Sequence, residues 1–117
     1  MVTQWSDNIA VADLQDEPTL SEDLASLAEQ SALVGPRATH LVLNFTGVTY
    51  INSSNLGQLL HLRRVLAQAN RRLVLCAMSE EIRSTFQVTG VHKLFTFAGD
   101  ALSALATLQL EDDIRGE

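Results

Sequence analysis

The sequence predicts an α/β fold: one domain built on a four- to five-stranded mixed sheet, with about four α-helices packed on it. Two observations lead to this prediction. Short apolar runs typical of buried strands alternate along the chain with longer segments whose apolar residues recur at the helical period. The chain also has 117 residues, the length of one compact domain. We expect that domain to span residues 1–110 and to be followed by a polar tail, residues 111–117, that frays.

Four segments have the composition of strands. A weak alternation over residues 8–14 predicts the first of them, with Trp5 in an edge strand before it. Two nearly continuous apolar runs, 41–45 and 72–77, predict central strands, since a strand that is buried on both faces shows no alternation. A shorter run at 94–97 predicts the last strand.

A capping box marks the start of the first predicted helix. Thr19 is followed by Glu22, so the hydroxyl and the carboxylate can each bind a free backbone N–H, with Pro18 just outside the helix. Gly35-Pro36 marks the end of this helix. We expect one apolar face to be buried, formed by Leu20, Leu24, Leu27 and Ala28.

A second helix is expected from Asn52 to about Ala69. Its core residues, chosen by the 3.6-residue period, are Leu56, Leu59, Leu60 and Leu66. Arg63 falls on the same side and does not fit the pattern. We expect its stem to lie over apolar surface while its guanidinium reaches water.

Two further helices are marked by capping residues. Ser79 caps a helix that buries Ile82 and Phe86 and that ends at Gly90. Asp100 caps the last helix. The residues of this helix that we expect to be buried are Leu102, Leu105 and Ala106.

Charge and composition disfavour several classes of function. Eight Lys and Arg residues against fourteen Asp and Glu residues give a formal net charge of -6, which argues against binding to nucleic acid or to an anionic membrane. No apolar stretch approaches the roughly 20 residues of a membrane span, and the N-terminus lacks a secretory signal, so we expect a cytoplasmic protein without direct membrane insertion. Cys76, the only cysteine, is expected to be an unreactive core residue.

No residue pattern predicts catalysis, a metal site or a cofactor. His40, His61 and His92 are widely spaced and lack nearby cysteines or carboxylates in a metal-site pattern. The chain has no Gly-rich phosphate loop, and neither Ser53 nor Ser54 lies in the signature of an activated nucleophile. We therefore expect a non-enzymatic protein without a metal or cofactor.

Residues 47–57, Gly-Val-Thr-Tyr-Ile-Asn-Ser-Ser-Asn-Leu-Gly, together with the order of the predicted elements, resemble the STAS family, named for sulfate transporters and anti-sigma factor antagonists. That family carries Asp-Ser-Ser-Gly-Leu-Gly at the start of a helix, and here Asn52 and Asn55 replace the Asp and the first Gly. The resemblance covers residues 41–97 and implies a STAS-like domain. It is weaker over the first third, where Leu-Gln-Asp-Glu at residues 14–17 stands in place of Gly-Glu-Leu-Asp.

The resemblance implies a signalling protein that regulates bacterial transcription. In anti-sigma factor antagonists the second serine of the motif is phosphorylated by the partner kinase, which puts the acceptor at Ser54, with Ser53 as the fallback. The implied mechanism is partner switching with an anti-sigma factor of the serine-kinase type, and a phosphoserine phosphatase is a further implied partner. A helix N-terminus tolerates a phosphate, which would repel a partner matched to a neutral hydroxyl.

The predicted docking surface follows the helix that begins at Asn52. Four of its residues lie close to whole numbers of turns apart: Ser54, Gln58, His61 and Val65. Gly57 costs this helix about 1 kcal/mol relative to Ala, which fits either close approach of a partner or ordinary packing within the chain. The residues predicted to dock the partner are Asn52, Ser53, Ser54, Asn55, Gly57, Gln58 and His61.

The sequence leaves a second hypothesis open. In it the serines are ordinary helix caps, and the chain is a structural STAS subunit of a larger complex, such as a stress-signalling scaffold or a lipid-transport machine, without phosphorylation. Asn52 and Asn55 favour it, because Asn52 lacks the negative charge of the family's Asp and Asn55 adds a side chain beside the proposed acceptor. Dimerisation of the chain is also left open.

Overall fold

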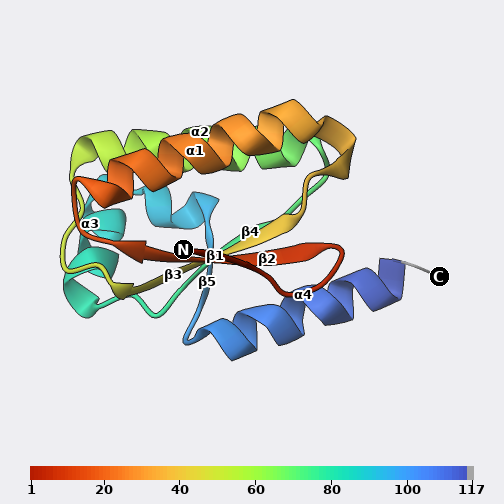
Figure 1. Ribbon diagram of the computed structural model, residues 1–117. Helices are drawn as coiled ribbons and strands as arrows, with labels where there is room; N and C mark the ends of the chain where they lie inside the picture. The colour runs from red at the N-terminus through yellow and green to blue at the C-terminus, as the bar shows by residue number, and fades with distance from the viewer. Residues whose placement is uncertain (116–117) are drawn as a thin grey trace.

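The computed structural model describes residues 1–115, which form a five-stranded sheet with helices on both faces (Figure 1). The strands lie in the order in which they occur in the sequence. They are β1 (Val2–Gln4), β2 (Ile9–Gln15), β3 (His40–Gly47), β4 (Leu73–Cys76) and β5 (Thr96–Ala98). β1 pairs antiparallel with β2, and every other pair of neighbours is parallel. The predicted α/β fold with a mixed sheet is confirmed.

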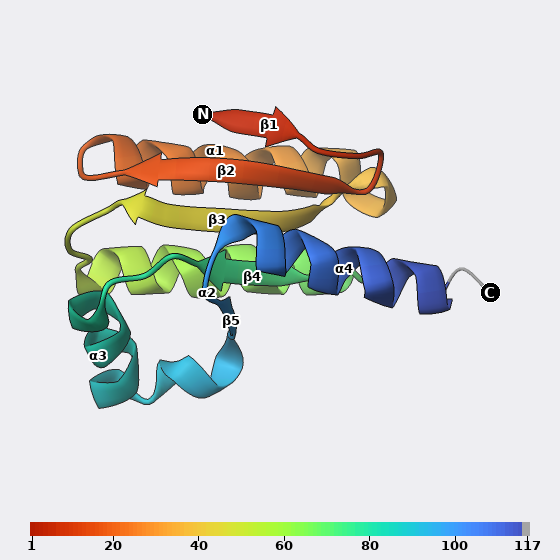
Figure 2. The same cartoon turned by 90° about the horizontal axis from the view of Figure 1, so that it is seen from below.

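The helices form two layers around the sheet. Helices α1 (Thr19–Val34), α2 (Ser53–Gln68) and α3 (Glu80–Thr89) pack on one face, and α4 (Ala101–Arg115) packs on the opposite face (Figures 1 and 2). Short 3-10 helices, η1 (Gly35–Arg37) and η2 (Val91–Leu94), follow α1 and α3. Because β2 and β3 are parallel neighbours, the chain leaves both strands at the same edge, and α1 and α2 begin together there.

The central strands are buried on both faces, which explains why their sequences are continuously apolar. Alternate residues of each strand point to opposite sides of the sheet. The layer under α1 and α2 contains Ala12, Leu43 and Leu75, and the layer under α4 contains Ile9, Val42, Val74 and Cys76. Burial raises the pKa of the Cys76 thiol to about 11, so Cys76 is a protonated core residue at neutral pH, as the sequence predicted.

Helix α1 begins and ends where predicted, but the predicted capping box does not form. Thr19 already lies inside the helix, so its hydroxyl is not placed to bind the first free N–H groups. Glu17, which precedes the helix, takes this role. Its carboxylate accepts the backbone N–H of Ser21 at 2.6 Å and also accepts the Ser21 hydroxyl. The predicted buried face is confirmed, with Leu20, Leu24 and Ala28 buried and Leu27 partly buried.

The bounds predicted for α2 are confirmed, but its buried face is rotated from the prediction. Its buried residues are Asn55, Leu56, Leu59, Leu62 and Leu66. Leu62, which the prediction omitted, takes the place of Leu60, and Leu60 is only partly buried. Because the buried face is centred on Leu62 and Leu66, Arg63 lies beside this face and is exposed, so it no longer conflicts with the helical pattern.

The predicted caps of the last two helices are present. The Ser79 hydroxyl accepts the N–H of Ile82 at 3.3 Å at the start of α3, and Gly90 ends this helix with a left-handed φ of 77°. The Asp100 carboxylate accepts the N–H of Ser103 at 2.7 Å before α4. The last strand begins two residues later than predicted, at Thr96, because residues 91–94 form η2.

Helix α4 differs from the prediction in its face and its length. Leu105 is buried as predicted, whereas Leu102 and Ala106 are exposed. The sheet is instead covered by Ala104, Leu105 and Leu108. Helix α4 continues to Arg115, so residues 111–115 of the predicted tail form its last turn, and residues 116–117 lie outside the described residues.

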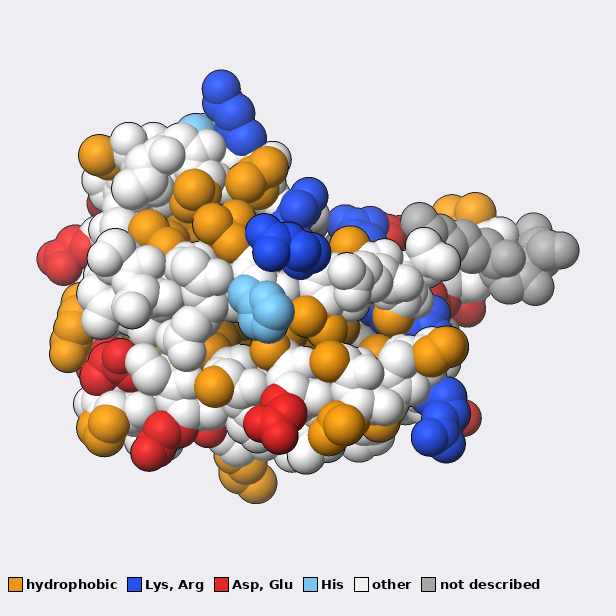
Figure 3. Space-filling view, turned by 90° about the horizontal axis from the view of Figure 1, so that it is seen from above, with side chains coloured by type: hydrophobic (Ala, Val, Ile, Leu, Met, Phe, Trp, Pro, Cys, Tyr) orange, Lys and Arg blue, Asp and Glu red, His pale blue; other side chains and the backbone are white. Residues whose placement is uncertain are grey.

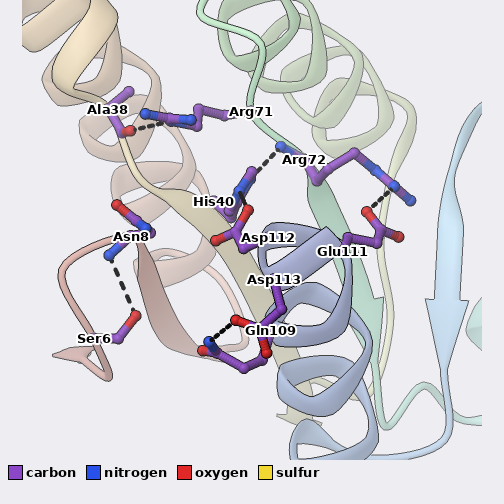
Figure 4. A network of polar contacts seen from close by, with 10 residues as sticks. All are labelled: Ser6, Asn8, Ala38, His40, Arg71, Arg72, Gln109, Glu111, Asp112 and Asp113. Carbon is purple, nitrogen blue, oxygen red and sulfur yellow. Dashed lines mark hydrogen bonds and ion pairs between the residues drawn. The ribbon is translucent and has the colours of Figure 1, made fainter. Parts of the chain in front are cut away.

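Two polar contacts join the last turn of α4 to the sheet (Figure 4). Arg72 forms a salt bridge with Glu111. Buried His40 accepts the backbone N–H of Arg72 at Nδ1, 2.9 Å away, so its proton is on Nε2, which donates to the Asp112 carboxylate at 2.9 Å. These contacts fix the rotation of α4 about its own axis.

Candidate functional site

The first turn of α2 is closed by a reciprocal pair of asparagines. The Asn52 side chain accepts the backbone N–H of Asn55 at 2.8 Å, and the Asn55 side-chain oxygen accepts the backbone N–H of Asn52 at 3.0 Å. This is the geometry of a capping box, with Asn in both positions. Two of the backbone donors at the helix start are thus satisfied by side chains, and the helix begins at Ser53.

Ser53 and Ser54 form the solvent-facing part of this turn. Both residues are exposed, as is Asn52 before them. The first turn of α2 contains no acidic side chain, so nothing within it offsets the positive end of the helix dipole. The exposed start of α2 therefore combines two hydroxyl groups with the N-terminal end of a helix dipole.

Asn55 does not belong to the exposed surface, contrary to the sequence prediction. It is 0% exposed, because its side chain turns inward toward the start of α1. Its amide group lies 3.4 Å from the Glu17 carboxylate and from the Ser21 hydroxyl, and 3.3 Å from the side-chain oxygen of Gln58. Asn55 cannot touch a docked partner, and it acts instead as a link between the two helix starts.

Glu17 is the charged centre of this link. The hydroxyl and backbone N–H of Ser21 hold the pKa of the Glu17 carboxyl below its ordinary value, with smaller contributions from the side chains of Asn55 and Asn52. The side chain of Gln58 donates to the backbone carbonyl of Ser21 at 3.0 Å. The starts of α1 and α2 are therefore held together by an ionised carboxylate and by amide hydrogen bonds.

A second carboxylate holds the loop that leads into α2. Asp16 follows β2 and accepts both the backbone N–H and the hydroxyl of Thr49, each at 2.8 Å. These bonds lower the pKa of the Asp16 carboxyl. Gly47 ends β3, and a Cβ atom at this position would come within 2.9 Å of the Leu14 carbonyl oxygen. The loop that leads to Ser53 and Ser54 is thus fixed by contacts with the end of β2.

A groove of about 650 Å³ runs between α1 and α2, with Ser54 in its lining. Figure 3 shows this face of the molecule, with hydrophobic side chains along it and basic and His side chains beside them. Helix α2 contributes Ser54, Gly57, Gln58, His61 and Val65. Helix α1 contributes Leu24, Ala25, Ala28, Glu29 and Ala32. The four residues of the stripe predicted from helical spacing are therefore brought together along one wall of this groove.

Gly57 is exposed in this wall, and no contact within the chain requires a glycine there. A Cβ atom added at Gly57 would have no other atom within 4 Å, apart from its own helix. Close packing within the chain, one of the two explanations offered by the sequence, is therefore wrong for this residue. The space above Gly57 opens toward solvent, between Ser54 and His61.

A comparison of the chain with known protein families identifies the family to which it belongs. The model of the STAS domain family matches residues 12–104, from β2 into α4, a range that contains the α2 start and the groove. The chain belongs to the STAS domain family. The predicted resemblance is thus confirmed, and it extends back to residue 12, into the first third of the chain, where the sequence motif is weakest.

The relatives and solved structures that are similar to this STAS domain include anti-sigma factor antagonists. BtrV of Bordetella bronchiseptica, named as an anti-sigma factor antagonist, is 29% identical over 82 residues, which cover 70% of this chain and 71% of BtrV. The Bacillus cell-fate determinant SpoIIAA, in its phosphorylated form, is 21% identical with a TM-score of 0.70, covering 92% of this chain and 97% of SpoIIAA. A chain from the structure of the stressosome is 16% identical with a TM-score of 0.73, covering 93% of this chain and 96% of that one. The two structures share the fold of this STAS domain.

The described part of the STAS domain offers no group of three or more His, Cys, Asp or Glu residues that could hold a metal ion. His40 is buried between the sheet and α4, His61 is exposed in the groove wall, and His92 lies in η2. None of the helices over residues 1–115 is long and apolar enough to cross a membrane.

The sequence prediction missed three residues that shape the site: Asp16, Glu17 and Ser21. Asp16 and Glu17 lie where the STAS motif of the first third is altered, directly after β2, and Ser21 lies in the first turn of α1. Since the next strand in the sheet is a parallel neighbour, residues that follow the two strands meet at one edge. The signal in the sequence that could have identified this part of the site is the pair of carboxylates directly after a predicted strand.

Proposed function

We propose that this STAS domain is an anti-sigma factor antagonist that acts in the cytoplasm by partner switching. It binds an anti-sigma factor of the serine-kinase type and has no catalytic activity of its own, and phosphorylation of Ser54 ends the complex until a phosphoserine phosphatase restores the hydroxyl. The observation that carries the proposal is the exposed position of Ser54 in the first turn of α2, in the lining of the α1–α2 groove. The family match and the similarity to BtrV support it.

A phosphate on Ser54 is compatible with the fold. The free N–H groups and the positive dipole at a helix start favour an anion, and the first turn of α2 carries no acidic residue that would repel it. A phosphoserine brings a charge of about -1.5 to -2 at neutral pH. The modification therefore leaves the STAS domain folded and acts on the partner, whose surface would have to accept this charge.

The groove gives the anti-sigma factor an apolar surface that is continuous with Ser54. Its walls are mostly small or apolar side chains, and Gly57 leaves space for close approach. An apolar group of the partner in this groove would be held beside the acceptor hydroxyl. Docking and phosphorylation would then be coupled, because the kinase that modifies Ser54 is also the protein that occupies the groove.

Gly57 provides a test of the groove that is separate from the charge at Ser54. Gly57→Leu is expected to weaken binding of the cognate anti-sigma factor about tenfold, because the added side chain occupies space used by the partner. The free energy of unfolding should not fall, since the added Cβ meets no atom and Gly is about 1 kcal/mol worse than Ala within a helix. Isothermal titration calorimetry and urea unfolding measure the two effects. Gly57→Ala, with a single added carbon, should bind more tightly than Gly57→Leu. Equal affinity of Gly57→Leu and the unmodified protein would rule out the groove as a docking surface.

The phosphorylation step is tested with the cognate kinase. The purified STAS domain is incubated with the anti-sigma factor and ATP, and the phosphate is mapped by mass spectrometry. We expect a single site at Ser54, so Ser54→Ala should accept no phosphate. Phosphate mapped to Ser53 in the unmodified protein would move the acceptor to the fallback position. The phosphorylation switch would be excluded if the kinase modified neither serine while it remained active on another substrate.

One observation favours a second candidate function. Asn52 and Asn55 satisfy each other at the start of α2, so the altered motif has a complete structural role without phosphorylation. In this case the chain is a structural STAS subunit of a larger complex, either a stress-signalling scaffold, as the fold shared with the stressosome chain suggests, or a lipid-transport machine. Co-purification with scaffold or transporter subunits, combined with no serine modification by the kinase, would favour it.

A further inference from the structure

The two walls of the α1–α2 groove carry opposite charges. Helix α1 contains three acidic residues and no Lys, Arg or His, whereas α2 contains His61, Arg63 and Arg64 and no acidic residue. Glu29 lines the groove on the α1 side, and His61 lines it on the α2 side. Arg64 follows His61 by three residues, so the two side chains are neighbours on one side of α2. Figure 3 shows the hydrophobic side chains of this face between acidic side chains on one side and basic and His side chains on the other.

These opposite charges lie at the same level along the groove but do not pair with each other. Ser21 accepts hydrogen bonds from the side chains of Asn55 and Gln58, which come 34 and 37 residues later in the chain. Because α1 and α2 run side by side in the same direction (Figure 1), the same offset places Glu29 level with Arg64. Both salt bridges of the described part of the chain involve the last turn of α4, so none crosses the groove. The two walls therefore present their charges to solvent.

The shape of the groove fits a helix. Its lining on α2 extends from Ser54 to Val65, about 17 Å, which is the length of about three helical turns. Both walls are helices whose backbone groups are bonded internally along the groove, so an extended peptide would find no row of free N–H and C=O groups there. A helix satisfies its own backbone and needs only side-chain contacts. Small residues of the lining let it come close to both walls, namely Ala25, Ala28, Ala32 and Gly57.

We propose that the groove takes an amphipathic helix of the anti-sigma factor, with a basic flank against α1 and an acidic flank against α2. This docking mode rests on the proposed function, in which that factor occupies the groove, and it specifies the segment that enters. The apolar stripe of the helix packs over Leu24 and Ala28, which are buried at the floor of the groove. A Lys or Arg on one flank pairs with Glu29, and an Asp or Glu on the other flank pairs with Arg64. A helix with the two flanks exchanged would bring like charges together along both walls, so the charges select the partner.

The charged walls can be changed without altering the proposed phosphorylation site. Arg64 comes ten residues after Ser54, about 15 Å farther along α2. This separation exceeds the screening length of about 10 Å at 0.1 M salt, so exposed charges at residues 29 and 64 act weakly on the Ser54 hydroxyl. Variants of the walls therefore test the docked helix by itself.

An exchange of the two charges tests the pairing at constant net charge. Glu29→Lys combined with Arg64→Glu keeps the formal net charge at -6. Isothermal titration calorimetry should show that this variant binds the cognate anti-sigma factor at least about tenfold more weakly, because two attractive contacts become repulsive. Both residues are exposed, so urea unfolding of the variant should match that of the unmodified chain.

The matched control exchanges two charges on the sides of the same helices that face away from the groove. It combines Asp23→Lys with Arg63→Glu. Arg63 lines a separate cleft beside Leu94 and Thr96, and Asp23 lies one turn before Ser26, which faces away from the groove on α1. The control should bind like the unmodified chain.

Equal affinity of the groove exchange, the control and the unmodified chain would overturn the charged pairing. Gly57→Leu then separates this failure from a failure of the proposed function. If Gly57→Leu still weakens binding, the anti-sigma factor occupies the groove without using these charges. If Gly57→Leu also binds normally, docking in the groove is wrong as well.

Hydrogen exchange of the anti-sigma factor, free and in the complex, identifies the segment that docks. We expect the protected segment to be a helix with Lys or Arg on one flank of its apolar stripe and Asp or Glu on the other. Exchanging those charges in the anti-sigma factor should restore its binding to the variant with Glu29→Lys and Arg64→Glu. A protected loop or strand in place of a helix, or no restoration of binding, would contradict the proposal.

Discussion

Ser54→Asp is expected to weaken binding of the cognate anti-sigma factor by about tenfold to a hundredfold. The substitution places a fixed negative charge in the exposed first turn of α2, in the lining of the α1–α2 groove. A partner that binds a neutral hydroxyl would have to bury or approach this charge without a matching cation. The free energy of unfolding should stay the same or rise by up to about 1 kcal/mol, because an acidic residue near a helix N-terminus is favourable.

Calorimetry of the complex and urea unfolding of the free chain separate these two effects. Ser26→Asp is a matched control, because Ser26 is also exposed but lies on the side of α1 that faces away from the groove. It should bind like the unmodified protein. If Ser54→Asp and Ser26→Asp bind equally well, the charge at Ser54 does not govern docking.

Asn55→Asp is expected to cost about 3–5 kcal/mol of stability at neutral pH, the largest effect of any single substitution considered for this site. Asn55 is fully buried, and its amide lies 3.4 Å from the Glu17 carboxylate. The substitution replaces a hydrogen-bond donor with a second carboxylate, so a fully buried charge would face the partly exposed carboxylate of Glu17. Urea unfolding at pH 7 measures the loss. Asn52→Asp is the matched control, because this position is exposed and precedes the helix, and it should change stability by no more than about 1 kcal/mol.

The loss in Asn55→Asp should depend on pH. Burial and the like charge of Glu17 raise the pKa of the new carboxyl in the folded state, so its penalty is absent when it is protonated and grows as the pH rises. In the unmodified protein the pKa of Glu17 is lowered from 4.5, so the stability from Glu17 is present above that pH and is lost as the pH falls. The stability curves of the two proteins should therefore converge on acidification. A difference that stays constant from pH 7 to pH 4 would contradict this account of the contact between residues 55 and 17.

Local signals in the sequence were sufficient to place α2 and its exposed serines. The start of a helix depends on nearby capping residues, and Asn52 provides one. The stripe from Ser54 to Val65 follows from the helical period alone, so its residues were predicted correctly to share one side. The opposite wall of the groove, which α1 forms, was not predicted, because it depends on how α1 packs beside α2.

Features that depend on tertiary contacts were missed. A capping Asn can point outward or inward, and the inward position of Asn55 is set by Glu17, which lies 38 residues earlier in the chain. The face of α4 was predicted incorrectly because both sides of this helix are apolar, so periodicity could not decide which of them meets the sheet. The side that was chosen from the sequence, through Leu102 and Ala106, is the exposed side.

The central claim is that the start of α2 and the adjoining groove are the surface that the partner occupies. It is tested most directly by an NMR titration of the ¹⁵N-labelled chain with its cognate anti-sigma factor. We expect the amide signals of residues 53–61 and of the α1 groove wall to shift or broaden, and we expect Ser54→Asp to need a higher concentration of the anti-sigma factor for the same changes. A footprint confined to α4 or β1, with the signals of residues 53–61 unchanged at saturation, would contradict the claim.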